Sequence, residues 1–417
     1  EGQIEANFRR SAGISATIPE FALRRSPIMA AREFVPGNLL YANGSRFKIN
    51  RYHVPVRERL EPETVHVDLP RRRIHGGESS GYAESAPLPM PVVEISDCDL
   101  EHISHISDEE GNRFQVPVMM LGQLLPRHRG GSMYQVNGRN LQHMRGQAIR
   151  LLNAGPMDQV TQPKPKLGYP VCTVCGHVRS PYASDEELKN FRALHKSTCG
   201  REVENVGFTA EAQVDGFWIP DLESASQAAS LAESLRLGAQ QVLEMDQDDL
   251  QVLLLQNAQD GYDLFLYDPM AGGSGVLSQV LRQWREVLAA AREVLTHCPS
   301  GCEKACYDCL KDYGNVLYHK HLDRHLALKV LEGYDDAPVH VTNLPAMDSL
   351  KQVAGTGATN KAEYRLAKLL AWHQFPKPEA QVRIDLPPGL GIPYTITDFL
   401  YELPSGSRVA IYLDGLS

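Results

Sequence analysis

Four cysteines lie within twelve residues of this 417-residue chain, at Cys298, Cys302, Cys306 and Cys309. Their spacing is C-x3-C-x3-C-x2-C. Thiolate sulfur is a preferred ligand of Zn²⁺, and four thiolates this close together match a closed tetrahedral site. Two disulfides or four buried thiols are the alternative. Because the chain shows no secretory features, we expect a structural zinc site.

A second group of metal-ligand residues comes earlier in the chain. Cys172 and Cys175 form a Cys-x2-Cys-Gly knuckle, and His195 and Cys199 follow, one helical turn apart from each other. Residues i and i+4 of a helix lie on one face, so His195 and Cys199 can reach a common ion. The spacing C-x2-C-x19-H-x3-C predicts a second structural zinc site, with His177 as the alternative fourth ligand.

The composition is that of an ordinary globular protein, with 42% apolar and 22% charged residues. The formal net charge of −9 argues against a generally basic surface that coats nucleic acid, but not against a local basic path. The sequence contains no apolar run of about 18 residues and no signal peptide, so no membrane span is predicted. The clustered cysteines suit a reducing compartment, and we expect a cytoplasmic protein. The leftover Cys98 is expected to be a buried thiol.

The periodicity of apolar residues predicts a multidomain, mixed α/β (α+β) fold. It indicates a hairpin turn at Asn43-Gly44, strands near 92–95, 252–255 and 263–268, and helices over 221–243, 277–296 and 313–331. We divide the chain into five segments: 1–90, a β-rich segment and linker; 91–220, a mixed domain with the CxxC…HxxxC site; 221–342, a domain with the four-cysteine cluster; 343–360, a linker; and 361–417, a further α/β unit.

Two features predict contact with phosphates despite the acidic total. Arg127, Arg129, Arg139 and Arg145 give one stretch of the chain local positive charge. The turn Gly272-Gly273-Ser274 between a strand and a helix can present amide donors to a nucleic-acid phosphate. Close packing of the strand on the helix is the alternative, because no Gly-Lys-[Ser/Thr] follows as in a P-loop.

Three acidic residues near the end of the chain are candidate catalytic residues. Glu363 lies on an expected helix, and Asp398 and Asp414 lie on expected neighbouring strands. Carboxylate oxygens that converge at strand ends can hold Mg²⁺. The pattern therefore indicates a magnesium-dependent nuclease site.

Several of these stretches together resemble the C-terminal region of MrfA-type helicases, which are superfamily 2 DNA helicases with a zinc-binding domain built on four cysteines. They are residues 30–47, residues 223–248, the Tyr267-Asp268-Pro-Met-Ala-Gly-Gly-Ser-Gly motif and Cys298 to Leu310. The resemblance covers roughly residues 25–335. It implies that the four clustered cysteines are the zinc ligands of this family, and that the partner is DNA, single-stranded or forked. The earlier CxxC…HxxxC site and the domain that follows it resemble those of the large helicase proteins of bacterial anti-phage systems, such as Druantia and DISARM.

The last 57 residues resemble a PD-(D/E)xK nuclease of the very-short-patch-repair type. This resemblance implies a truncated restriction-endonuclease-like domain over residues 361–417. Glu363, Asp398 and Asp414 match its helical Glu and its two strand positions. The sequence departs from the pattern at Leu416, where a lysine is expected, and the expected downstream histidine would lie past Ser417, so the catalytic set in this chain is incomplete.

The chain contains no Walker A motif and no Asp-Glu-x-His box. The ATPase lobes and their ATP, which the resemblance implies, are therefore expected before residue 1 or on another subunit, and the start without Met indicates a piece of a longer protein. The leading hypothesis is a nucleic-acid-binding accessory region of a bacterial ATP-dependent DNA helicase in anti-phage defence or DNA repair. The alternatives are a metal-dependent nuclease and a non-enzymatic scaffold subunit that contacts other defence-system proteins.

Overall fold

The computed structural model describes residues 3–9, 18–54, 60, 62–69, 72–75, 87–106, 116–201, 203–246, 249–257, 261–270, 272–348, 363, 366–367, 370, 375–376, 378–386, 394–402 and 407–413. The chain divides into two compact units. The larger unit comprises Gln3–Leu125 and Gly130–Leu344, and the smaller comprises Glu1–Gly2, Pro126–Arg129 and Pro345–Ser417. The predicted multidomain, mixed α/β fold is confirmed. The finer boundaries after residues 90, 220, 342 and 360 stay predictions.

A five-stranded sheet forms one part of the larger unit. Its order is β2 (Phe21–Arg25), β1 (Ile4–Phe8), β8 (Cys98–His105), β4 (Ser45–Tyr52) and β3 (Leu40–Ala42). The β3–β4 hairpin turns at Asn43-Gly44, where both residues have positive φ, 47° and 67°. A two-residue type I′ turn requires this conformation, so the predicted turn is confirmed.

A second, larger sheet closes on itself at one end. Its pairings run from strand to strand around a ring and return to the first: β14 (Glu204–Leu222), β7 (Leu88–Glu94), β5 (Glu63–Asp68), β6 (Arg73–His75), β9 (Val118–Leu124) and β12 (Arg139–Pro156). One cluster of buried apolar residues draws on five of these strands, with Val67, Met90 and Leu121 among its members. The ring therefore has its own core.

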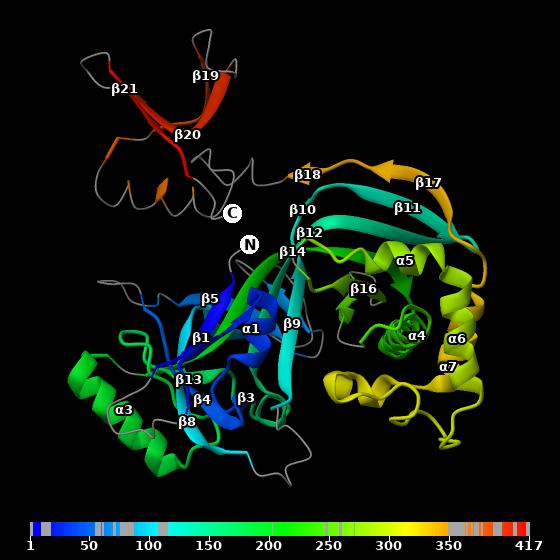
Figure 1. Ribbon diagram of the computed structural model, residues 1–417, viewed down its shortest axis with the longest axis horizontal. Helices are drawn as coiled ribbons and strands as arrows, with labels where there is room; N and C mark the ends of the chain where they lie inside the picture. Colours follow the sequence, from blue (N-terminus) through cyan, green and yellow to red (C-terminus); the bar gives the residue numbers. More distant parts are fainter. Residues whose placement is uncertain are drawn as a thin grey trace. The chain divides into compact units, whose positions relative to one another are not determined.

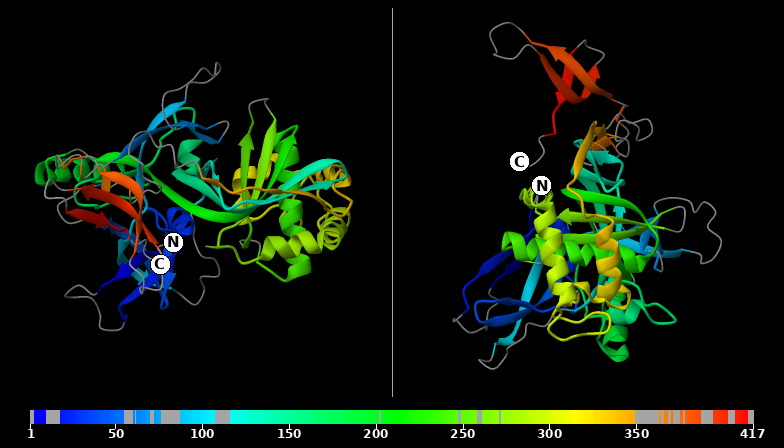
Figure 2. Two further views of the ribbon diagram at one scale, coloured as in Figure 1. Left: turned by 90° about the horizontal axis from the view of Figure 1, so that it is seen from above. Right: turned by 90° about the vertical axis from the view of Figure 1, so that its right-hand side faces the viewer.

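Two long strands carry the sheet beyond the ring. β12 and β14 have 18 and 19 residues, and β14 continues to pair with β16 (Tyr262–Asp268) while β12 pairs with β11 (Gly131–Val136). β15 (Gln251–Gln256) and β17 (Val339–Leu344) complete this extension. Figure 1 shows the extension reaching the helices α4 and α6, and the views of Figure 2 agree.

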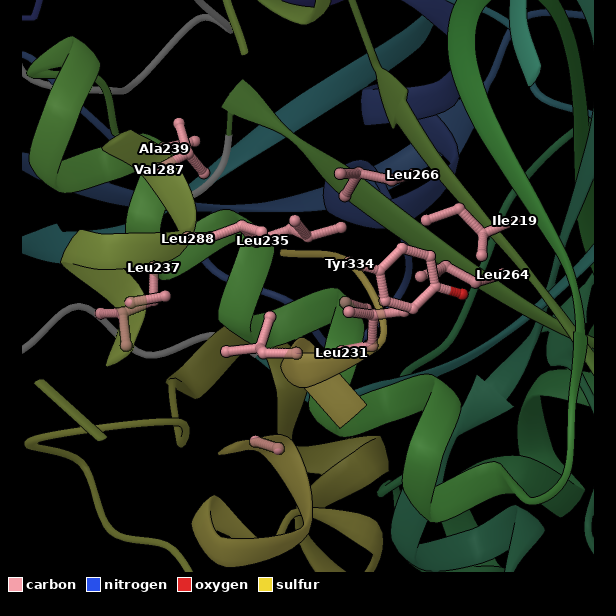
Figure 3. Packing of buried hydrophobic residues seen from close by; sticks show 14 of the residues in the cluster. Ile219, Leu231, Leu235, Leu237, Ala239, Leu264, Leu266, Val287, Leu288 and Tyr334 are labelled. Atoms are coloured by element: carbon pink, nitrogen blue, oxygen red, sulfur yellow. The ribbon is translucent and has the colours of Figure 1, made fainter. Parts of the chain in front are cut away.

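Helices cover one face of the extension. α4 (Ala225–Leu243) begins after Ser224, whose hydroxyl accepts a hydrogen bond from the Gln227 amide at 3.2 Å. Leu231 and Leu235 of α4 belong to one buried cluster with Tyr334 and the sheet residue Leu264 (Figure 3). α4 also packs against α6 (Trp284–Thr296) so closely that a Cβ at Gly238 would lie 2.1 Å from the Val287 carbonyl oxygen. The predicted helix is confirmed, and it is buried on all sides along its middle.

Two predicted helices are interrupted. The helix expected over 277–296 is α5 (Val276–Arg282) followed by α6, with a break at Gln283. The one expected over 313–331 is the 3-10 helix η2 (Tyr313–His321) followed by α7 (Arg324–Glu332). The Asp323 carboxylate accepts hydrogen bonds from the backbone amides of His325 and Leu326, which starts a new helix there. The apolar residues keep a helical spacing across both breaks, so the spacing alone does not show where one helix ends and the next begins.

The smaller unit contains β10 (Arg127–His128) paired with β18 (Met347–Asp348), and a three-stranded antiparallel sheet. The sheet consists of β19 (Glu379–Asp385), β20 (Tyr394–Glu402) and β21 (Arg408–Ile411). β17 ends inside the predicted 343–360 linker and β18 lies within it, while residues 349–360 of this linker lie outside the described part. No helix in the described ranges is long and apolar enough to cross a membrane.

Candidate metal centres and nucleic-acid surfaces

The four clustered cysteines converge on one point, which we call the knot. The sulfur of Cys298 lies 3.7 Å from that of Cys302 and 3.5 Å from that of Cys306. The sulfur of Cys309 lies 3.7 Å from Cys302 and 3.8 Å from Cys306. A zinc ion with Zn–S distances of about 2.3 Å requires S···S edges of about 3.8 Å, whereas a disulfide would bring two sulfurs to about 2.05 Å. The knot therefore fits a zinc ion with four protein ligands and no water.

The knot joins three helices. It follows the end of α6 at Thr296, and Asp312 then starts η2 by accepting a hydrogen bond from the Gly314 amide at 2.6 Å. Arg324, the first residue of α7, donates from Nε to the Cys302 carbonyl and from Nη1 to the Leu295 carbonyl, both at 2.8 Å. The knot belongs to the same buried cluster as α4. Zinc at this position would stabilise the packing of all these helices.

The second predicted group, which we call the knuckle, also converges. Nδ1 of His195 lies 3.4 Å from the Cys175 sulfur and 3.5 Å from the Cys199 sulfur. Cys172 completes the group, in which all four ligand atoms lie within 4.8 Å of one another. A tetrahedral zinc ion with one nitrogen and three sulfur ligands requires N···S edges of about 3.6 Å. The knuckle therefore fits a second zinc ion.

The structure brings His195, and not the alternative His177, together with the three cysteines of the knuckle. Nδ1 of His177 lies 3.3 Å from the Cys175 sulfur, but His177 is outside the group of four convergent ligand atoms. The His177 carbonyl accepts a hydrogen bond from the Cys172 amide at 2.9 Å, which closes the turn. A histidine next to a thiolate ligand can donate a hydrogen bond to it and so support the metal from outside.

The knuckle connects a peripheral helix to the five-stranded sheet. α3 (Asp185–Cys199) begins with a capping box of Ser184 and Glu187, and its only buried side chain is that of His195. On the other side, Gly176 has a φ of 78°, and a Cβ there would lie 2.0 Å from the Tyr52 carbonyl oxygen of β4. This glycine permits the close approach, and a zinc ion in the knuckle would hold α3 in place.

Cys98, the eighth cysteine, is completely buried in β8. Burial raises the pKa of its thiol well above the ordinary value, and the neighbouring Asp99 and Asp97 add to this. A neutral thiol without solvent access is not a nucleophile, which confirms the expectation of a buried thiol.

The Gly-rich turn is organised from within by Asp268. Its buried carboxylate accepts a hydrogen bond from the Met270 amide at 2.9 Å and from both the amide and the hydroxyl of Ser274. Gly273 has a φ of 79°, and a Cβ there would lie 2.7 Å from Oδ2 of Asp215. The amide and hydroxyl of Ser274 thus donate to a protein carboxylate. This agrees with the alternative expectation, in which the turn serves close packing of the strand on the helix. A phosphate contact of Gly272, Gly273 and Ser274 stays a prediction.

The candidate arginines belong to both units. Arg127 and Arg129 are in the smaller unit, and Arg139 and Arg145 are on β12 in the larger one. Arg139 is exposed, with its guanidinium 5.5 Å from the ring centre of Tyr334. Arg145 is exposed beside a shift in the register of β12 and β14. Their contact with phosphates stays a prediction.

A basic cavity of about 780 Å³ lies in the larger unit and was not predicted. Its lining includes two basic residues, Arg72 and Lys320, one buried carboxylate, Asp68, and the imidazoles of His319 and His321, together with apolar residues. The Arg72 guanidinium lies 4.7 Å from the ring centre of Tyr318. Burial lowers the pKa of His321, and the charges of Arg72 and Lys320 lower it further. No local sequence motif indicates this site, because Arg72 and the η2 residues of its lining are far apart in the sequence.

In the smaller unit, two of the three predicted nuclease residues share one neighbour. Nε2 of Gln381 donates to Glu363 and to Asp398, at 3.3 Å in each case. Glu363 is buried, and Gln381 has a φ of 54°, which is uncommon for a residue other than glycine. The Leu413 amide donates to Asp398 at 2.6 Å. Asp414 lies outside the described residues.

Comparison with known proteins identifies the region around the knot. Residues 231–310 match the family model of the MrfA Zn-binding domain. The Druantia protein DruE of Escherichia coli (strain UMEA 4076-1) is 29% identical over 109 residues, which are 24% of this chain and 6% of that protein. The uncharacterized ATP-dependent helicase YprA of Bacillus subtilis (strain 168) is 32% identical over 88 residues, 19% of this chain and 12% of that protein.

Solved structures of the DUF1998 helicase MrfA are similar over a larger part of the chain. The DNA-bound structure has a TM-score of 0.36 and 11% identity and covers 80% of this chain and 34% of MrfA. The structure titled without DNA has a TM-score of 0.39 at the same identity, with 79% of this chain covered and 34% of MrfA.

The chain thus spans a small share of the length of its curated relatives. The family match ends at Leu310, one residue after the last cysteine of the knot, so the convergent sulfurs lie inside the matched domain. Residues 231–310 thus match the MrfA Zn-binding domain, and parts of the chain are similar in sequence to DruE and YprA.

Proposed function

We propose that this chain is a nucleic-acid-binding accessory region of a bacterial ATP-dependent DNA helicase that acts in anti-phage defence or DNA repair. The observation that carries the proposal is the MrfA Zn-binding domain over residues 231–310, together with the sequence similarity to DruE and to a protein described as an ATP-dependent helicase. ATP would be bound by motor lobes elsewhere in the longer protein or on another subunit, in the cytoplasm.

The geometry suggests how such a region would work. The knot carries η2 on one side, and η2 contributes His319, Lys320 and His321 to the basic cavity. Zinc would keep this wall rigid, because Asn315 of η2 donates to the carbonyl of Leu310, next to Cys309, at 2.8 Å. The positive charges of Lys320 and of Arg72, which also lines the cavity, would attract the phosphates of a strand, single or forked, that the motor delivers.

The test is DNA binding by the full chain, measured by fluorescence anisotropy with labelled single-stranded and forked DNA at several salt concentrations. A variant with Arg127, Arg129, Arg139 and Arg145 all changed to Ala should bind every sequence more weakly. The slope of log K against log salt should fall by about 0.7 to 0.9 for each lost phosphate contact.

The matched control is Arg24→Ala, which removes an exposed arginine that pairs with Glu5 at 2.8 Å on the N-terminal sheet. Its affinity should equal that of the wild type. Unchanged affinity in the fourfold variant would reject these arginines as the DNA path. A chain that binds no DNA but co-purifies with a motor protein would favour a scaffold subunit of a defence complex.

A second candidate function is a magnesium-dependent nuclease in the smaller unit. The observation that favours it is the approach of Glu363 and Asp398 to the same amide of Gln381. Two carboxylates this near each other can share a hard cation, and Asp414 would be the third ligand. The missing lysine at Leu416 counts against an active site in this chain.

Plasmid cleavage with Mg²⁺ separates the two functions. Asp398→Ala should abolish cleavage, whereas Asp385→Ala should not, because Asp385 is an exposed residue of β19 whose partner is Arg383 at 3.0 Å. No cleavage by the wild type, or equal cleavage by wild type and Asp398→Ala, rejects the nuclease.

A further inference from the structure

The part of α3 after its first turn carries a local excess of positive charge. Residues 188–201 contain four basic side chains and no carboxylate, whereas the whole chain has a formal net charge of −9. All four are exposed: Lys189, Arg192, Lys196 and Arg201. Spacings of three and four residues place the first three on one side of the helix, and we call them the basic stripe.

The acidic residues of α3 are set apart from the basic stripe. All of them lie in the first turn, at 185–187. Glu187 accepts a hydrogen bond from the Ser184 amide at 2.9 Å and pairs with Arg179 at 3.5 Å, so it is engaged at the start of the helix. Asp185 lies one turn before Lys189 on the same side of α3. Among the residues that the structure describes, neither Lys189 nor Arg192 pairs with a carboxylate, so both can approach an anionic partner.

α3 contributes little to the core of the larger unit. Its only buried side chain is that of His195, and Leu194 is 56% exposed. Two of the four convergent ligand atoms of the knuckle belong to α3, those of His195 and Cys199. A zinc ion in the knuckle would therefore fix the direction in which the basic stripe points. Charges held on a rigid helix lose less freedom on binding than charges on a mobile segment.

The length of the basic stripe suits a nucleic-acid backbone. Lys189 and Lys196 are seven residues apart, which is about 10.5 Å along a helix that rises about 1.5 Å per residue. Each strand of duplex DNA carries one phosphate per about 3.4 Å of helix axis, so the stripe can follow about three phosphates. An interface with another protein usually has an apolar or aromatic centre. The exposed α3 residues beside the stripe, Ala193 and Ser197, are small and offer no such centre.

We propose that the basic stripe of α3 is a further DNA-binding site of this chain, which contacts the sugar-phosphate backbone without regard to sequence. This proposal rests on the proposed DNA-binding function. It adds a site outside both the basic cavity and the stretch from Arg127 to Arg145. The knuckle would then hold the stripe against a strand, just as the knot would hold η2.

Fluorescence anisotropy of the full chain with labelled duplex and forked DNA tests the proposal. A stripe variant has Lys189→Gln, Arg192→Gln and Lys196→Gln together, and it should keep the helix because glutamine has a similar helix propensity. It should bind at least about tenfold more weakly at about 0.1 M salt. The slope of log K against log salt should fall by about 0.7 to 0.9 for each lost phosphate contact, equally for two unrelated sequences.

The matched control removes three exposed positive charges elsewhere on the larger unit. It combines Arg24→Gln, Arg285→Gln and Lys329→Gln, so its net charge equals that of the stripe variant. Its affinity should lie within about twofold of the wild type. Thermal unfolding and zinc content should match the wild type in both variants.

Hydrogen exchange of the wild type tests the contact without any substitution. Saturating DNA should slow the exchange of amides in residues 188–199, and the same DNA should leave these amides unchanged in the stripe variant.

The outcomes separate this site from the proposed function. Weaker binding by the stripe variant than by the charge control, with slower exchange in α3 of the DNA-bound wild type, supports the site. If the wild type binds DNA while the two variants agree in affinity and slope, the site is rejected and the DNA-binding function stands. A wild type that binds no DNA rejects both. If the stripe variant loses binding to poly-L-glutamate but not to DNA, the partner is an acidic protein surface, and the proposal is overturned.

Discussion

The knot and the knuckle each bring four ligand atoms together, four sulfurs in the knot and three sulfurs with one nitrogen in the knuckle, but their surroundings differ. The knot takes its four ligands from one short loop and is part of the buried cluster around α4, with Cys298 and Cys309 buried. The knuckle takes its ligands from a turn and a helix, and that helix, α3, buries only His195. A metal site embedded in a core stabilises the core, whereas one at the periphery stabilises only what it tethers.

The largest expected effect is the loss of one ligand. Cys306→Ser should destabilise the helical part by more than about 4 kcal/mol, because zinc binding is coupled to folding and the knot is shared by α6, η2 and α7. Cys199→Ser should instead release α3 and leave the core folded. Hydrogen exchange with mass spectrometry distinguishes the two. Faster exchange throughout the larger unit in both variants would contradict the contrast.

The next largest effect is expected at Arg324, whose side chain braces the knot by hydrogen bonds to two carbonyl groups. Arg324→Met removes two hydrogen bonds from a charged donor to the carbonyls of Cys302 and Leu295 and should lower the free energy of unfolding by about 2 to 3 kcal/mol. Arg285→Met, at an exposed position of α6, is the control and should be within about 0.5 kcal/mol of wild type. Chemical denaturation measures both, and equal values would show that the brace does not support the knot.

A smaller effect is expected at the start of α3. Ser184→Ala removes the capping box and should cost about 1 kcal/mol, which corresponds to about fivefold faster exchange of the amides in the first turns of α3. The helices around the knot should be unaffected. Ser197→Ala, on the exposed face of the same helix, is the control. A change in η2 would mean that the two metal centres are coupled.

The smallest effect concerns pH. Since the pKa of His321 is lowered in the folded state, the unfolded state binds its proton more readily, and stability falls as the pH drops through the ordinary histidine value of about 6.5. The groups that face it are Arg72, Lys320, His319 and Asp68. His321→Gln should reduce this pH dependence in thermal unfolding between about pH 5 and 8. An unchanged slope would show that His321 titrates normally.

Local spacing predicted both groups of ligand atoms that converge in the structure, because a metal site built from one loop or one helical turn is encoded within a few residues. The choice between His177 and His195 was not local: both lie near Cys175, and only the packing of α3 decides which joins the group. Arg127, Arg129, Arg139 and Arg145 stood out as a linear cluster, yet they belong to two units.

The basic cavity and the contact between Arg32 and Gln251 could not be predicted from the sequence, because each combines residues from distant stretches of the chain. Arg32 and Gln251, which share a hydrogen bond, are 219 residues apart, and each looks like an ordinary surface residue in its own stretch. In the sequence, Glu233 and Arg236 resemble two charges on the exposed face of a helix, but the middle of α4 is buried on all sides. Long strands such as β14, which serve both the ring and the extension, bring these distant residues together.

By itself, the sequence determined the mixed fold class, some of the strands, the hairpin at Asn43-Gly44 and the two groups of convergent ligand residues, since backbone propensities and ligand spacing act over a few residues. Only the tertiary structure decided where the helices break, which metal centre is embedded in a core, and which charged side chains meet in a cavity. These outcomes depend on burial and on contacts between remote segments, and the free energy of such contacts has no counterpart in any single stretch of the chain.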